Sequence, residues 1–253
     1  MTDPPCGPSS ILVNLELPDP APLSPTLIDA LSSLRVVLLG WFAVPEQTSP
    51  AQARDQFGVE AEETLDTAAR RFEDAGAEVT TRLVFTGDKL DTLIRVSTEE
   101  NCDAVLIPGT MDAPRRVLVP LRGLENIHRT APFVADLCRE STATVTLLHI
   151  VDDEETEASA RDAVLKPAAD RMREYGLDTT LLELNALEVD ASPSDAIVDR
   201  ASAYDLVVLG ETKPSVQDVL FGTVPERIVK TTDVPIVVVR HRGKNADVAE
   251  QLL

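Results

Sequence analysis

The sequence is poor in aromatic residues, which make up only 4% of its 253 residues. A hydrophobic core must therefore be built mainly from Val, Leu, Ile and Ala. The hydrophobic fraction of 43% is large enough for such a core, and this excludes wholesale disorder. A chain of this length has room for one large domain or two small ones.

Basic residues are also scarce: 23 stand against 43 acidic residues, which gives a formal net charge of −20. This charge repels phosphate backbones and anionic lipids, so we expect neither nucleic acid nor a membrane surface as a partner. Arginine outnumbers lysine 18 to 5, and together with the acidic excess this indicates a halophilic protein from a cytosol rich in salt. Salt would screen most of the self-repulsion. An acidic protein of an ordinary cytosol is the alternative.

Cysteine occurs three times, at Cys6, Cys102 and Cys138, and no two cysteines form a C-x-x-C pair. This spacing argues against a zinc ribbon, a redox motif and a disulfide framework, and it is typical of a reducing cytosol. Residues 1–10 contain no basic segment followed by an apolar one, so we expect no signal peptide and a cytoplasmic location. The longest apolar run, residues 36–44, is about half the length needed to cross a bilayer, so no membrane insertion is expected.

Short apolar runs alternate with segments of helical periodicity along the chain. Buried strands that alternate with amphipathic helices indicate parallel sheets joined by right-handed crossovers. Gly76 and Gly176 follow two of the helices and are expected to end them. The expected strands are 11–17, 35–44, 79–85, 103–108, 116–121, 144–151, 179–184, 205–209 and 236–240, and the expected helices are 24–33, 50–75, 88–99, 127–138, 160–175, 194–203 and 225–230.

The pattern of strands and helices restarts after residue 114. Three features of the first copy match features of the second: Gly76 matches Gly176, residues 103–109 match 205–210, and residues 11–13 match 117–119. Two copies of one α/β unit are the economical interpretation. After Gly210 the second copy continues with a loop, a helix and a strand, whereas the first copy has only residues 110–114 before the next unit begins.

The expected fold class is therefore α/β, with two tandem doubly wound parallel-sheet units, the first lacking the last helix and strand. We expect a disordered head at residues 1–9, units at 10–114 and 115–241, and a tail at 242–253. The last strand, 236–240, is apolar and would form an exposed sheet edge, which invites pairing. Because the first copy offers no matching strand, we expect a homodimer through this strand.

One segment, residues 210–223, combines a loop after a buried strand with the start of a helix. Open parallel sheets place ligands at the carboxyl ends of their strands. Gly222 and Thr223 open a helix with Pro225 in its first turn, so free backbone N–H groups and the positive end of the helix dipole suit an anion such as phosphate. In the alternative interpretation, Thr223 only caps the helix and the glycines only relieve backbone strain.

Three segments share a family likeness: Val117-Leu118-Val119-Pro120, the strand VTLLHIV at 145–151, and the run VVLGET…LFGTVPERIVKTTDVPIVVVR. With them, residues 10–241 resemble the universal stress protein (UspA) family. The resemblance implies a five-stranded parallel sheet in the order 3-2-1-4-5, of the adenine nucleotide alpha hydrolase-like kind, and a regulatory protein rather than an enzyme. Many members bind ATP through a G-x2-G-x9-G-[ST] loop after the fourth strand, and many dimerise through the fifth.

The resemblance implies a nucleotide site, for ATP with Mg²⁺ or another phosphate ligand, in the second unit. Gly210 matches the first glycine of the loop, Gly222 the third and Thr223 the Ser/Thr. Lys213 stands where the second glycine belongs, and eight residues rather than nine separate it from Gly222.

The end of the first strand in the second unit differs from the family at one position. Pro120 matches the family, but Arg122 occupies the position of an Asp that usually contacts the nucleoside. Arg122 and Lys213 would both add positive charge, which favours an anion without a standard adenine pocket. The remaining site residues implied are Val224 and Ile150.

Three functional hypotheses stay open. The first is a nucleotide-responsive regulatory module. The second is a nucleotide-free dimeric scaffold or regulatory partner, for example of a membrane transporter, because Leu121-Arg122-Gly123 and the shorter loop also resemble stress-protein-like cytoplasmic domains of some amino-acid permeases. The third and least supported is a slow ATPase, since no general base is identifiable. His149, in a predicted strand, is expected to be a core histidine rather than a base.

Overall fold

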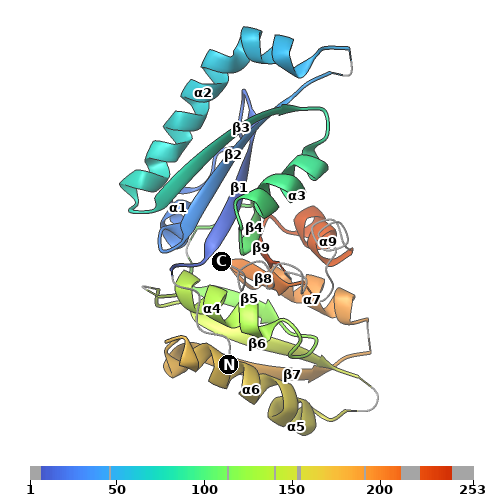
Figure 1. Ribbon diagram of the computed structural model, residues 1–253. Helices are drawn as coiled ribbons and strands as arrows, with labels where there is room; N and C mark the ends of the chain where they lie inside the picture. The colour runs from blue at the N-terminus through green and yellow to red at the C-terminus, as the bar shows by residue number, and fades with distance from the viewer. Residues whose placement is uncertain are drawn as a thin grey trace, which may run out of the picture.

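The computed structural model places nine strands in one sheet with helices on both faces (Figure 1). The structure describes residues 7–45, 47–112, 114–139, 141–152, 155–190, 192–211 and 223–240. The strands are β1 (Ser10–Leu17), β2 (Arg35–Ala43), β3 (Glu78–Thr86), β4 (Ala104–Ile107), β5 (Arg116–Pro120), β6 (Thr144–Val151), β7 (Leu182–Glu188), β8 (Leu206–Gly210) and β9 (Ile236–Val239). Their order across the sheet is β3-β2-β1-β4-β9-β8-β5-β6-β7.

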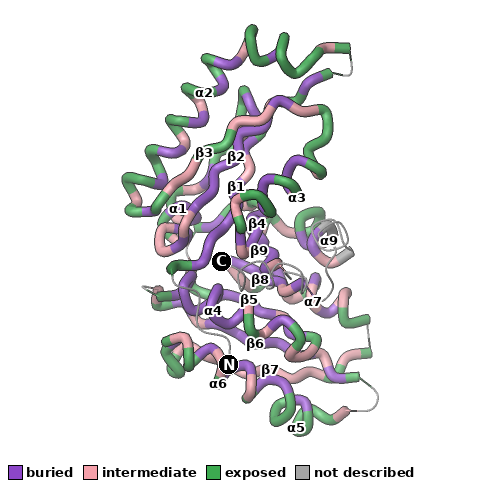
Figure 2. Tube along the Cα trace, viewed as in Figure 1, coloured by how far each residue is buried: buried purple, intermediate pink, exposed green. Residues whose placement is uncertain are grey.

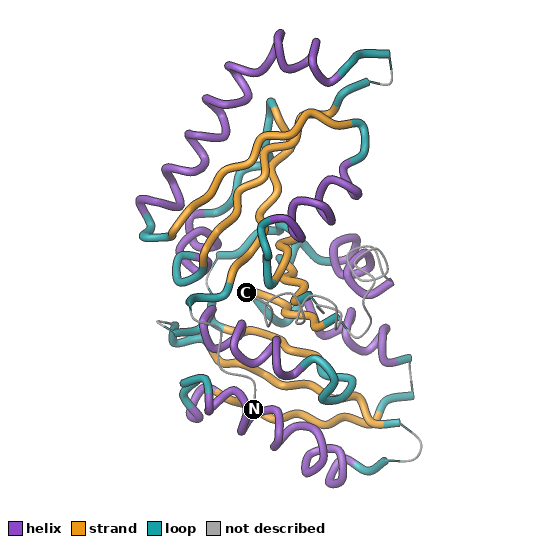
Figure 3. The backbone as a smooth tube through the Cα atoms, viewed as in Figure 1, coloured by secondary structure: helices purple, strands orange, loops and turns teal. Residues whose placement is uncertain are grey.

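Helices cover each face of the sheet, so the strands lie in the middle of three layers (Figure 3). Along β1, Ile11 and Val13 pack into one apolar cluster and Leu12 into the other, because successive side chains of a strand point to opposite faces. The first face carries α1 (Pro25–Leu31), α2 (Pro50–Asp74), α4 (Ile127–Leu137), and α5 (Glu157–Ala160), which continues through a π-helical turn (Arg161–Leu165) into α6 (Lys166–Glu174). The second face carries α3 (Lys89–Glu99), α7 (Pro193–Ala201) and α9 (Thr223–Thr231).

Burial follows the layers: the central strands are largely buried and the outer faces of the helices are exposed (Figure 2). The core is aliphatic, as the composition requires. Phe72 and Phe133 are the two aromatic side chains among the largest that are fully buried. Within the described ranges, no helix has the length and apolar character needed to span a bilayer.

All nine strands predicted from the apolar runs are present, with one clear shift. The strand expected at 179–184 begins at Leu182, because Thr179–Leu181 forms a 3-10 turn in which the Asp178 carboxylate accepts a hydrogen bond from the amide of Thr180 at 2.8 Å. The helix predicted at 194–203 also begins one residue earlier, as α7 at Pro193. Ser192 caps this helix by accepting a hydrogen bond from the amide of Asp195 at 3.2 Å, and Pro193 occupies its first turn.

The two halves of the chain share the same local devices. Gly76 and Gly176 both have φ +94°, and each ends its helix as predicted, with its amide donating at 2.9 Å to the carbonyl three residues back. In each half, an aspartate just before the fourth strand accepts a hydrogen bond from the first residue of the first strand. The Asp103 carboxylate accepts from the amide of Ser10 at 2.9 Å, and the Asp205 carboxylate accepts from the amide of Arg116 at 2.8 Å. The matched runs in the sequence thus occupy matched positions.

The strand order repeats between the halves up to the last strand. β3-β2-β1-β4 and β7-β6-β5-β8 are parallel sets with the same connectivity. β9 continues the second set by pairing parallel to β8, and its other edge pairs antiparallel with β4. The free edge expected at 236–240 is therefore absent: the open edge of β4 in the first half covers it. A homodimer contact through this strand has no unpaired backbone to use.

Residues 1–6 of the predicted head and the predicted tail at 242–253 lie outside the described residues. Ser9 was expected in the disordered head and is instead ordered, with an exposed fraction of 4%. Its amide and hydroxyl donate to the Asp136 carboxylate at 2.8 and 2.7 Å. This contact fixes the start of β1 against α4.

The β4–β9 pairing predicts how the protein unfolds. Val238 is fully buried and lies opposite Val105 in this ladder. Val238→Ala should lower the free energy of unfolding by about 2–3 kcal/mol, because two methyl groups and their packing are lost. In denaturant titrations the midpoint should be independent of protein concentration for both proteins. A midpoint that rises with concentration would show that the strand pairs between chains.

Candidate functional site

The carboxyl ends of β5 and β8 meet at one edge of the second half of the sheet, where open parallel sheets bind ligands. A small cavity lies there between the two strands and the start of α4. We call it the carboxyl-edge crevice, and its lining includes Pro120, Arg122, Glu125, Asn126, Thr130 and Gly210. The structure thus brings together three residues predicted for the site: Pro120, Arg122 and Gly210.

The volume of the carboxyl-edge crevice is about 20 Å³. One water molecule needs a cavity of about 10–15 Å³, whereas pockets for drug-sized ligands measure about 300–1,000 Å³. In the described arrangement the crevice has room for a water molecule and not for an adenosine.

Side chains of α4 close the crevice against Gly210. A Cβ atom at this position would lie 3.0 Å from Oγ1 of Thr130 and 3.3 Å from Nδ2 of Asn126. Thr130 is 2% exposed and Asn126 is 6% exposed, so neither side chain has open space around it. The glycine at 210 therefore permits close packing of β8 against α4, a role that neither interpretation of the sequence included.

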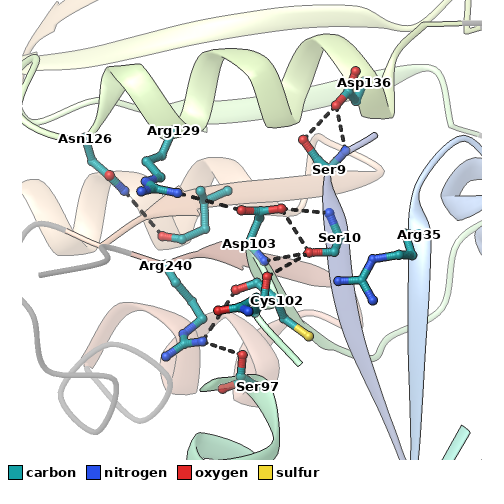
Figure 4. A network of polar contacts seen from close by, with 12 residues as sticks. Ser9, Ser10, Arg35, Ser97, Cys102, Asp103, Asn126, Arg129, Asp136 and Arg240 are labelled. Atoms are coloured by element: carbon teal, nitrogen blue, oxygen red, sulfur yellow. Dashed lines mark hydrogen bonds and ion pairs between the residues drawn. The ribbon is translucent and has the colours of Figure 1, made fainter. Parts of the chain in front are cut away.

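Asn126 also ties α4 to the last strand. Its Nδ2 donates to the carbonyl of Val239 at 3.4 Å, as Figure 4 shows, and its Oδ1 has no hydrogen-bond partner among the residues that the structure describes. Arg129, three residues further along, reaches the Asp103 carboxylate 3.9 Å away in the first half (Figure 4). The start of α4 therefore contacts both the crevice and the first half of the chain.

Glu211 follows Gly210 directly and is fully buried. Its amide donates to the carbonyl of Val239 at 2.9 Å, which continues the β8–β9 ladder by one residue. Glu211 thus extends the pairing between the two strands at the carboxyl end of β8.

The loop after β5 is fixed from the neighbouring strand. The amide of Leu121 donates to the carbonyl of Leu148 at 2.7 Å, and Nδ1 of His149 lies 2.8 Å from the carbonyl of Leu121. Nε2 of His149 contacts the Glu155 carboxylate at 3.0 Å. With an exposed fraction of 5% and both ring nitrogens bonded, His149 is the core histidine that the sequence predicted. Arg122 is exposed at the mouth of the crevice.

Ile150 and Val224, also predicted for the site, are not among the residues that line the crevice. Ile150 and Val224 are half-buried and pack against the apolar cluster on the second face of the sheet. Thr223 is the first residue of α9. Lys213 and Gly222 lie outside the described residues, and so does the loop between them.

An ion pair holds α9 against α7. Nη2 of Arg227 lies 2.5 Å from the Asp195 carboxylate, and Ile228 of the same helix is fully buried. Hydrogen bonds from Ser192 and then from Arg227 lower the pKa of Asp195 below its ordinary value of 3.8. These contacts fix the helix whose amino end the sequence predicted as an anion site.

Two residues that shape the crevice were missed in the sequence: Asn126 and Thr130. No local signal existed for Asn126 and Thr130. Their effect depends on how closely α4 approaches β8, which is a tertiary distance.

This arrangement, a doubly wound parallel sheet with a glycine and a helix start after one strand, defines a class of α/β proteins with a ligand edge. The model of the Universal stress protein family matches residues 114–240, half of the chain. The chain belongs to the universal stress protein family. No curated protein matches the sequence.

Solved structures share the fold over nearly the whole chain. A universal stress protein from Archaeoglobus fulgidus DSM 4304 has 16% identity and a TM-score of 0.62, with 93% of this chain and 97% of that chain covered. A functionally unknown protein from Pseudomonas aeruginosa PAO1 has 15% identity and a TM-score of 0.51, with 96% of each chain covered. The cytoplasmic domain of a prokaryotic cation chloride cotransporter has 12% identity and a TM-score of 0.52, with 97% and 100% covered.

The close approach at Gly210 yields a stability prediction. Gly210→Ala should lower the free energy of unfolding by about 1–2 kcal/mol, because the new methyl group meets Thr130 Oγ1 at 3.0 Å. In the background of Thr130→Ala, where that oxygen is absent, the same substitution should cost less. Equal costs in both backgrounds, measured by urea unfolding, would mean that α4 does not press on Gly210.

The Asp195–Arg227 pair yields a pH prediction. Because the pKa of Asp195 is lower in the folded state, the ionised carboxylate stabilises the fold at pH values above 3.8, the pKa in the unfolded state. This stabilisation is lost as the pH falls through the lowered pKa of the folded state. The stability difference between wild type and Asp195→Asn should therefore shrink below pH 3.8. Asp199→Asn, on the same helix, is the matched control and should show no such convergence in unfolding titrations.

Proposed function

We propose that this universal stress protein family member is a regulatory module that acts through its protein surfaces, without a nucleotide held in the carboxyl-edge crevice. The observation that carries the proposal is the volume of about 20 Å³, closed by Asn126 and Thr130 against Gly210. Opening the crevice would require the start of α4 to move away from β8, where its residues are buried and hydrogen-bonded.

Hydrogen-bond chemistry supports the same conclusion. An aspartate after the first strand can accept hydrogen bonds from ribose hydroxyls, whereas the Arg122 guanidinium has only donors. This difference weakens the binding of a nucleoside, and it does not affect contacts made on the outer surface.

The structural likeness to a transporter domain supports a role as a regulatory partner. The similar structure is the cytoplasmic domain of a cation chloride cotransporter, and the likeness covers 97% of this chain. A module of this shape is thus compatible with work beside a membrane protein, and a protein partner of that kind is the one we propose.

A phosphate ligand without a nucleoside is the second candidate. Arg122 is exposed at the mouth of the crevice, and a guanidinium binds phosphate with two parallel hydrogen bonds. Such a ligand would sit outside the closed cavity, against the Arg122 guanidinium.

Nucleotide content separates the two candidates from the ATP site implied by the family resemblance. Protein purified natively in high salt should release no stoichiometric ATP, ADP or AMP on treatment with acid, and titration with Mg-ATP should give no saturable heat. A partner captured by the protein should remain bound when ATP is added. Near-stoichiometric nucleotide would overturn the proposal.

Two variants sharpen this test. Arg122→Ala should leave the response to Mg-ATP unchanged if the crevice is closed, and it should abolish binding of inorganic phosphate if the second candidate is correct. The double variant Asn126→Ala, Thr130→Ala removes the side chains that close the crevice. Gain of Mg-ATP binding in this variant would show that their packing excludes the nucleotide, and its folding is verified by circular dichroism.

A further inference from the structure

A second cavity lies at the other end of the same strands, between the two halves of the chain. It has a volume of about 270 Å³ and opens beside the carboxyl ends of α1 and α4, at the start of β5 and β8. We call it the junction cavity. Its lining includes Asp29, Ala30 and Ser33 from the first half and Val117, Leu137 and Cys138 from the second.

The deep wall of the junction cavity is apolar. Val117, Leu137 and Leu206 are 3%, 5% and 2% exposed, and all three line it. A cavity of about 150 Å³ with such a lining accommodates benzene, and small-molecule pockets begin at about 300 Å³. The junction cavity thus has the size for an aromatic ring or branched alkyl group with a short side chain.

The charge around the cavity favours a cation. Among its described lining residues there is no lysine, arginine or histidine, and Asp29 is exposed at its rim. The carboxyl ends of α1 and α4 lie at the cavity, and the carboxyl end of a helix carries partial negative charge. The net charge of −20 acts in the same direction.

The apolar wall and the carboxylate of Asp29 at the rim together match an amine on an apolar body.

We propose that the junction cavity binds a small organic cation, a primary amine with an aromatic or branched aliphatic body. The body packs against Val117, Leu137 and Leu206, and the ammonium group lies toward Asp29. Such a ligand touches α1 of the first half and α4 of the second, so it ties the halves together. This site is separate from the carboxyl-edge crevice and does not depend on the nucleotide question.

A pair of probes with opposite charge tests the proposal. 2-Phenylethylamine should bind saturably in calorimetry and in ligand-observed NMR, whereas phenylacetate, with a similar body and a carboxylate, should not. Asp29→Asn should weaken the amine about threefold to tenfold, because it removes the charge at the rim. Asp74→Asn, an exposed acid at the end of α2, is the matched control and should leave the affinity unchanged.

The cysteines locate the bound amine. Burial raises the pKa of Cys102 and of Cys138 to about 12, so both thiols should react slowly with iodoacetamide. Cys138 lines the junction cavity, whereas Cys102 packs into the cluster on the opposite face of the sheet. Bound amine should slow the modification of Cys138, measured by mass spectrometry, and leave that of Cys102 unchanged.

Several results would overturn the proposal. They are the absence of saturable amine binding, equal binding of phenylacetate, equal effects of Asp29→Asn and Asp74→Asn, or equal protection of both cysteines. Melting temperatures close to wild type verify that each variant is folded.

Discussion

The antiparallel ladder between β4 and β9 joins the two halves of this protein. The first half forms four strands and would leave the edge of β4 unpaired, and an unpaired edge promotes association with other chains. The fifth strand of the second half pairs with that edge, from Ala104 opposite Val239 to Ile107 opposite Ile236. One strand therefore satisfies two edges, and the halves run in opposite directions.

The polar contacts at the junction follow from this direction. Because β9 is antiparallel to β4, the residue after β9 lies at the start of β4, and the amide of Arg240 donates to the carbonyl of Asp103 at 2.8 Å. The Arg240 guanidinium donates to the carbonyl of Ser97 at 2.7 Å, near the end of α3. Ser9 and Asp136 add a further connection between the halves (Figure 4). In a parallel arrangement these groups would lie at opposite edges of the sheet.

α4 lies along this junction and shapes both cavities. Its first turns supply Asn126 and Thr130 at the carboxyl-edge crevice, and its last turn supplies Leu137 at the junction cavity. The crevice is closed because polar side chains occupy the space beside Gly210, and the junction cavity lies beside the carboxyl ends of α1 and α4. The larger of these two cavities is therefore at the opposite end of the strands from the ligand edge.

The sequence by itself determined the strands, the ends of two helices and the family. Buried strands produce apolar runs, and Gly76 and Gly176 occupy a backbone region that favours glycine, so both signals are local. The family resemblance implied a site with Pro120, Arg122 and Gly210, and these three residues line one crevice. Only the tertiary structure decided the partner of β9 and the volume of the crevice. Strand pairing joins residues more than a hundred positions apart, and a cavity depends on differences of a few tenths of an ångström between side chains, which no local pattern records.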